Sequence, residues 1–99
     1  MKQVHYRDWK LILVVLADDE LSAAARENIE EICRQELTGC RPIIADASID
    51  PEVMEKYQVF VIPTLVREEP EPVKKLIGSL ANRRIVLQEL GIQPGIPTP

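Results

Sequence analysis

The feature that most constrains the fold is an apolar run near the N-terminus, Trp9 to Ala17 (WKLILVVLA). Its residues are almost continuously apolar and rich in branched side chains, with no polar residue at alternate positions. A strand of this kind is buried on both faces, as the central strands of α/β domains are. We therefore expect a sheet that is covered on both sides.

A helix and a second strand are predicted after this run. Asp18 and Asp19 supply oxygen acceptors and negative charge, which favour the start of a helix. Apolar residues recur at helical spacing from Leu21 to Leu37, and Gly39 ends the helix. The segment Pro42 to Ala45 is predicted as a second strand, reached by a right-handed crossover.

The second half is predicted to complete an α/β fold in the order β-α-β-α-β-β-α. Its expected elements are a short helix from Glu52 to Tyr57, a strand from Thr64 to Val66, a turn from Glu68 to Pro72, a strand from Val73 to Ile77 and a helix from Leu80 to Leu90.

Length and charge limit the class of protein. The chain has 99 residues, enough for one domain, which we place at residues 1–92, with a proline-rich disordered tail at 93–99. Sixteen Asp and Glu outnumber 12 Lys and Arg, which argues against a nucleic-acid surface. No stretch approaches the ~20 apolar residues of a membrane helix. The polar start and the absence of a cysteine framework predict a cytoplasmic location.

Ile62-Pro63-Thr64 points to a fold family. A proline before a strand, after a branched apolar residue, is typical of the cis-proline of thioredoxin-like folds, although a trans proline at a strand start is the alternative. Thioredoxin enzymes carry Cys-x-x-Cys at the tip of the first strand. Ala17 to Leu21 (ADDEL) stands there and contains no cysteine. We expect a thioredoxin-like three-layer fold and a protein that is not an enzyme.

The remaining reactive side chains favour structural roles. Cys33 is expected in the core and Cys40 in a turn that can leave it exposed; a disulfide between them is conceivable, but a cytoplasmic location argues against it. His5, the one histidine, has no triad or metal partners beside it. Two cysteines and one histidine are fewer than the about four ligands of a zinc site. No catalytic residue, cofactor or metal is predicted.

Two basic pairs, Lys74-Lys75 and Arg83-Arg84, stand out in this acidic chain. They fit solvated faces, and the alternative is a docking surface for an acidic partner. The sequence leaves both interpretations open.

The region that holds these pairs carries a family resemblance. The run from Ile62 to Glu68 (IPTLVRE) contains a TPTL-type strand, and Pro70 and Pro72 follow in the turn. From Val73 to Arg83 (VKKLIGSLANR) the sequence is similar to V-[RK]-[RK]-I-I-G-D-L-S-N-R, at the same spacing. These motifs resemble the KaiB family of circadian-clock proteins, and the resemblance covers about residues 9 to 91.

The resemblance implies a protein-binding module that docks on a KaiC-like hexameric ATPase. Members of the family also compete with a histidine kinase and recruit other clock proteins, and the resemblance implies the same for this chain. The family's basic partner-binding residue appears here as Gln58, with Lys56 nearby. Lys56, Tyr57 and Gln58 are therefore the predicted partner-binding residues.

Departures from the family pattern indicate a divergent member. Ser79 replaces the usual Asp, Asp18-Asp19-Glu20 replaces Gly-Asn-Thr, and a proline-rich end replaces the acidic tail. One alternative function is a sensory domain of a histidine kinase, although Pro72 to Arg83 is more similar to KaiB itself and Met1 stands close to the first strand. The less favoured alternatives are a redox-inactive thioredoxin-like protein with another partner and a thiol–disulfide enzyme.

The resemblance also implies a metamorphic second half, whose other arrangement forms dimers or tetramers. Local preferences agree, because Val73 to Ile77 has helical spacing where a strand is needed, and Ile85 to Leu87 has strand character inside a helix. We expect the thioredoxin-like state to dominate, with Pro63, Gly78 and Ser79 as the structural residues. Ser79 is predicted to cap the last helix, and Gly78 to supply backbone freedom.

Overall fold

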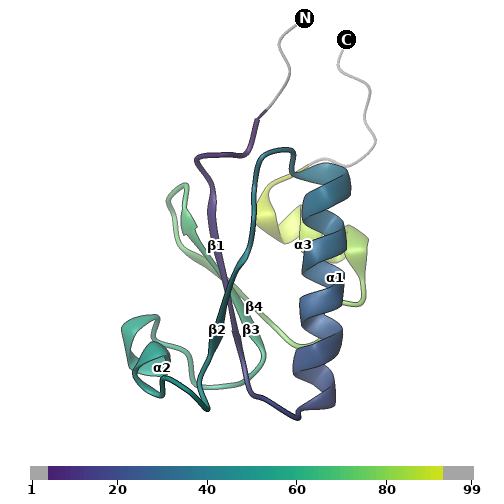
Figure 1. Cartoon of the computed structure of the whole chain (residues 1–99). Coiled ribbons are helices and arrows are strands. Elements are labelled where there is room, and N and C mark those ends of the chain that lie inside the picture. Colours follow the sequence, from purple (N-terminus) through teal and green to yellow (C-terminus); the bar gives the residue numbers. More distant parts are fainter. Residues whose placement is uncertain (1–4, 93–99) are drawn as a thin grey trace, which may run out of the picture.

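The structure, a computed structural model, describes residues 5–92 and contains one mixed sheet with helices on both faces (Figure 1). The predicted order of elements is confirmed. The elements are β1 (Lys10–Val15), α1 (Glu20–Glu36), β2 (Ile43–Asp46), α2 (Glu52–Lys56), β3 (Thr64–Glu69), β4 (Lys74–Ile77) and α3 (Arg83–Leu90).

The four strands lie in the order β2-β1-β3-β4. β1 runs parallel to β2, with Ile12 opposite Ile43, and antiparallel to β3, with Leu13 opposite Leu65. β4 pairs antiparallel with β3 and forms one edge of the sheet. The apolar first strand is therefore central, because it has strands on both sides and a buried cluster on each face.

Alternating residues of β1 divide the core into two clusters. Leu11, Leu13 and Val15 face α1 and α3, where the larger cluster forms. Ile12 and Val14 face the opposite side, where a smaller cluster forms beneath α2. Figure 1 shows the result as three layers, with α1 and α3 on one side of the sheet and α2 on the other.

The end of β3 corrects one prediction. The sequence predicts a turn from Glu68 to Pro72, but the strand continues through Glu69. Its last residues still pair with β1, since Glu69 lies opposite Lys10. Backbone pairing with the central strand β1 has overridden the turn preference of this polar segment.

The start of α3 corrects a second prediction. The helix begins at Arg83 instead of Leu80, and its cap is Asn82, whose Oδ1 accepts a hydrogen bond from the backbone N of Ile85 at 3.1 Å. Ser79 is therefore not the cap. Leu80 has a left-handed φ of 62° and a buried side chain, so the chain turns there to insert Leu80 into the core before the helix starts.

The two segments whose local preferences conflict with the predicted fold adopt the thioredoxin-like arrangement in this structure. Residues 74–77 form β4, and residues 85–87 lie inside α3. In the helix, Val86 and Leu87 are buried while Ile85 is exposed. The predicted disordered tail, 93–99, lies outside the described residues. Within residues 5–92, no helix is long and apolar enough to cross a membrane.

Candidate functional site

The loop between β1 and α1 occupies the position where thioredoxin enzymes hold their reactive cysteine. Here Asp19 caps α1, and its Oδ2 accepts hydrogen bonds from the backbone N and the Oγ of Ser22, at 2.9 and 2.7 Å. Ser22 Oγ in turn accepts one from the backbone N of Leu16 at 3.1 Å. Cys33 and Cys40 lie toward the other end of α1. A carboxylate-capped helix start thus stands where the enzymes have a thiol.

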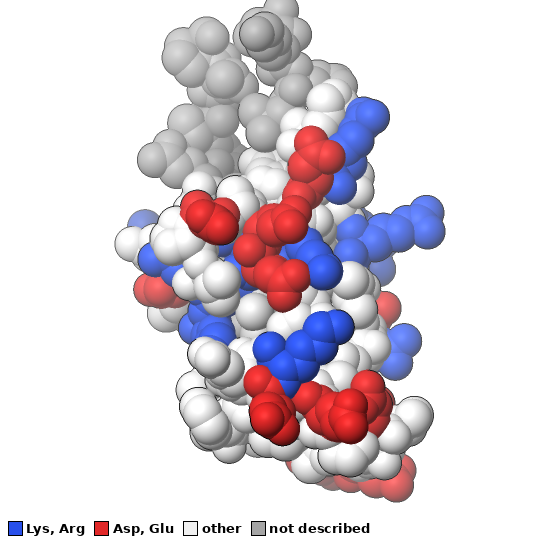
Figure 2. All heavy atoms as spheres, turned by 90° about the vertical axis from the view of Figure 1, so that its left-hand side faces the viewer, with Lys and Arg blue, Asp and Glu red and all other residues white. Residues whose placement is uncertain are grey.

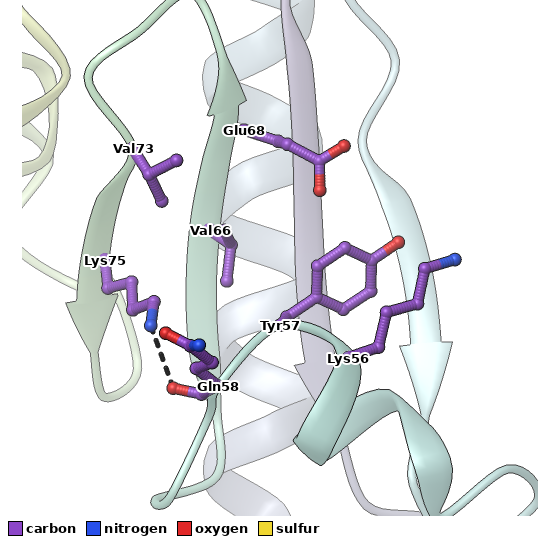
Figure 3. Close-up of a pocket in the computed structure, with 7 residues that line it drawn as sticks. All are labelled: Lys56, Tyr57, Gln58, Val66, Glu68, Val73 and Lys75. Carbon is purple, nitrogen blue, oxygen red and sulfur yellow. Dashed lines mark hydrogen bonds between the residues drawn. The ribbon is translucent and has the colours of Figure 1, made fainter.

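A surface groove of about 500 Å³ lies between α2 and the β3–β4 hairpin (Figure 3). The structure brings the three predicted partner-binding residues together in this groove; that they bind a partner stays a prediction. The groove is lined by Lys56, Tyr57, Gln58, Val66, Glu68, Val73 and Lys75. We call it the α2–β4 groove.

Local contacts fix the α2 side of the groove. Lys56 ends the helix, and its Nζ lies 5.3 Å from the centroid of the Tyr57 ring, within cation–π range. Tyr57 is half-buried and packs on the smaller core cluster. Gln58 has a φ of 54°, and its carbonyl oxygen accepts a hydrogen bond from Lys75 Nζ at 2.8 Å. This bond joins the segment after α2 to the edge strand β4.

The groove carries unpaired positive charge. Its carboxylate, Glu68, forms an ion pair with Lys10 at 2.9 Å, and this hydrogen bond and charge raise the pKa of Lys10. Lys56 and Lys75 are exposed, and among residues 5–92 neither has a carboxylate within ion-pair distance. Figure 3 shows them on opposite sides of Tyr57 and Val66.

The surrounding surface is of mixed charge. Figure 2, which views the α2 side of the sheet, shows acidic and basic side chains interleaved with uncharged surface between them. Such a face lacks the continuous positive field that a nucleic acid needs. It suits a protein partner whose own charges are arranged to complement it.

The predicted structural residues lie at the junction of β3, β4 and α1. Pro63 is buried, follows a cis peptide bond, and its carbonyl oxygen accepts a hydrogen bond from the backbone N of Gly78 at 3.0 Å. Gly78 has a φ of 108°, a region that favours glycine. The carbonyl oxygen of Ser79 accepts a hydrogen bond from Asn28 Nδ2 at 2.8 Å, which ties this junction to α1. A role in fold switching stays a prediction for all three.

Sequence reasoning did not assign two residues that the structure singles out. Lys75 completes the groove, and its signal was present in the basic pair Lys74-Lys75. Arg67 is 6% exposed, and its Nη1 and Nη2 donate to the carbonyl oxygens of Leu90 and Pro72, each at 2.7 Å. Arg67 also lies 5.4 Å from the centroid of the Trp9 ring. No local pattern marks an arginine in a strand as buried, so this contact was not predictable.

Comparisons with known proteins agree with this geometry. The protein-family model of the KaiB domain matches residues 12–92 of the sequence. The circadian clock protein KaiB3 of Synechocystis sp. (strain ATCC 27184 / PCC 6803 / Kazusa) is 32% identical over 85 residues, which cover 85% of this chain and 83% of that protein.

Two solved structures share the fold at low sequence identity. The N-terminal domain of Synechococcus elongatus SasA superposes with a TM-score of 0.66 and 20% identity, covering 98% of this chain and 94% of that one. Chloroplastic thioredoxin z superposes with a TM-score of 0.64 and 12% identity, covering 84% and 79%. The thioredoxin-like fold predicted from the sequence is thereby confirmed.

Proposed function

This chain belongs to the KaiB family of circadian clock proteins, and we propose that it is a non-enzymatic module that docks on a KaiC-like hexameric ATPase. The observation that carries the proposal is the α2–β4 groove, which gathers Lys56, Tyr57 and Gln58 with Lys75 on one exposed face. In this proposal the binding regulates circadian-type signalling or a related process.

The groove suits a partner that presents an acidic side chain beside an apolar one. Lys56 and Lys75 offer two ammonium groups without carboxylate partners among the described residues. Tyr57 and Val73 supply the apolar surface, Val73 being 52% exposed. Aromatic side chains with one polar end are common anchors in protein interfaces. Lysines at the rim accelerate association more than they strengthen the final complex.

The experiment is a binding titration of purified KaiC-like ATPase from the same organism against the chain and its Lys56→Glu variant. Reversing the charge should weaken binding, and the loss should shrink at high salt, because the attraction is screened. Arg84→Glu is the matched control: it makes the same charge change at an exposed residue of α3, on the other side of the sheet. It should leave the affinity within about twofold.

Other outcomes would assign a different function. Binding that is indifferent to Lys56→Glu and to salt would move the docking surface elsewhere. Failure to bind any KaiC-like ATPase, together with association with a histidine kinase, would favour the kinase-related alternative. Catalytic reduction of insulin disulfides over many turnovers would instead identify a thiol–disulfide enzyme, which the helix start at Asp19 does not support.

A further inference from the structure

The two cysteines meet at the end of α1. Cys33 lies in the last two turns of the helix, and Cys40 follows the turn that ends it. The backbone N of Leu37 donates to the carbonyl oxygen of Cys33 at 3.1 Å, and the backbone N of Cys40 donates to that of Leu37 at 2.9 Å. Gly39, with a φ of 90°, reverses the chain between them. This turn brings Cys40 back against the helix.

The two cysteines belong to the same buried cluster and line the same hollow, and their thiols differ in character. Both are free and buried in the larger core cluster, so Cys40 is not the exposed turn residue that the sequence allowed. Interaction with Cys40 raises the pKa of the Cys33 thiol, and the same interaction lowers the pKa of Cys40. Burial raises the pKa of Cys33 further. Its place near the negative end of the helix dipole also disfavours a thiolate there. Cys40 is thus the better nucleophile and Cys33 the proton-bearing partner.

The pair is reachable from solvent through a hollow of about 630 Å³ at this end of the molecule. Both cysteines line it, and so do two exposed arginines, Arg34 and Arg41, with Glu30 as the one acidic residue in the lining. Exposed guanidinium groups attract anionic reagents. The hollow therefore suits a small disulfide that carries carboxylates.

We propose that Cys33 and Cys40 form a reversible thiol–disulfide site that reacts with an anionic low-molecular-weight disulfide of the glutathione type. The Cys40 thiolate attacks one sulfur of the reagent, the reagent's S–S bond breaks, and one glutathione leaves as a thiolate. Cys33 then releases its proton to solvent and attacks the Cys40 sulfur, and the second glutathione leaves. Two protein thiols are oxidised by two electrons, and one glutathione disulfide is reduced to two glutathione molecules.

This site is independent of the docking surface. It lies at the end of the sheet opposite α2 (Figure 1), and it is not at the helix start that thioredoxin enzymes use. In a reducing compartment the pair rests as thiols, as the structure has it, and oxidation is transient. The disulfide would join the end of α1 to the segment before β2 and close a short loop, which restricts the unfolded chain.

The test treats the native full chain with glutathione disulfide at neutral pH, blocks free thiols with an alkylating reagent and measures intact and peptide masses. We expect the product to have lost the mass of two hydrogen atoms and to carry no alkyl group. A single glutathione adduct on Cys40 should appear first. The oxidised chain should melt higher by on the order of 10 °C, and dithiothreitol should reverse both changes.

Matched variants separate the two roles. Cys33→Ser should stop at the glutathione adduct on Cys40, and Cys40→Ser should react at least about tenfold more slowly. A native chain that stays reduced, carries two glutathiones, forms only disulfide-linked dimers, or reacts first at Cys33 would overturn the proposal. Because these four outcomes are measured on the unmodified chain, the proposal can be overturned even where a variant fails to fold.

Discussion

The two halves of this molecule are held together by different means. In the first half, β1 is buried on both faces and α1 adds a continuous apolar stripe. In the second half, β4 is an edge strand with exposed lysines, and α3 is attached through a few apolar residues and the guanidinium of Arg67. The first half therefore resembles a fixed frame. The second half buries residues of β3 and α3 in the same core, and the polar contacts of Arg67 add to this attachment. It also contributes β3 and β4 to the α2–β4 groove.

The largest effect is expected from truncation in the centre of the frame. Leu13 is fully buried between β2 and β3, so Leu13→Ala should lower the free energy of unfolding by about 2–5 kcal/mol. Ile77→Ala in β4 is the contrast: its side chain is 66% exposed, and about 0.5 kcal/mol or less is expected. Urea unfolding of both variants measures the difference. Equal losses would remove the distinction between the buried centre of the sheet and its exposed β4 edge.

Removal of the Arg67 guanidinium should give the next largest effect. Arg67→Met keeps the apolar stem but leaves the carbonyl oxygens of Leu90 and Pro72 without their donors. We expect a loss of about 1.5–3 kcal/mol, typical of hydrogen bonds to a charged group. Arg26→Met, which removes an exposed arginine paired with Glu30 on α1, should cost about 0.5 kcal/mol or less. Chemical denaturation compares the two, and similar losses would reject the role of Arg67 in holding α3.

A smaller effect tests the correction at the start of α3. Asn82→Ala should destabilise that helix by about 1 kcal/mol, because its side chain caps the helix. Ser79→Ala should be nearly neutral, since the contact made by Ser79 uses its backbone oxygen. If the second half has a competing arrangement, NMR spectra of the Asn82→Ala protein should show a second set of peaks confined to residues after about Asp50. A larger loss for Ser79→Ala would restore it as the cap.

The parts of the fold that could be predicted from the sequence follow the same division into two halves. The apolar run at β1 and the stripe of α1 are repeated, redundant signals, so both elements and the Asp19 cap were predictable. The start of α3 was not, because Ser79 and Asn82 are both good caps and the choice depends on burying Leu80 in the distant core. Part of the groove was predictable, because the family resemblance indicated Lys56, Tyr57 and Gln58 as partner-binding residues. The bond from Lys75 to Gln58 depends on strand pairing that no local pattern encodes.

The smallest effect concerns Asp46, at the end of β2 in the frame. Hydrogen bonds from the hydroxyl and backbone N of Ser48 lower the pKa of this carboxylate below its ordinary value of 3.8. A lowered pKa in the folded state stabilises the protein above the unfolded-state pKa, and this contribution is lost as the pH falls through the folded-state pKa. The stability difference between the chain and Asp46→Asn should thus be present at neutral pH and vanish in acid. A stability difference that is constant from neutral to acid pH would contradict the lowered pKa of Asp46.

The most direct test of the docking surface is a hydrogen-exchange footprint of the chain, free and bound to the purified KaiC-like ATPase. We expect protection in the segments that line the α2–β4 groove, residues 56–58 and 73–75, with little change in the exposed face of α1. Protection that spares both groove segments and falls instead on α1 or on the edge strand β2 would contradict docking at the α2–β4 groove.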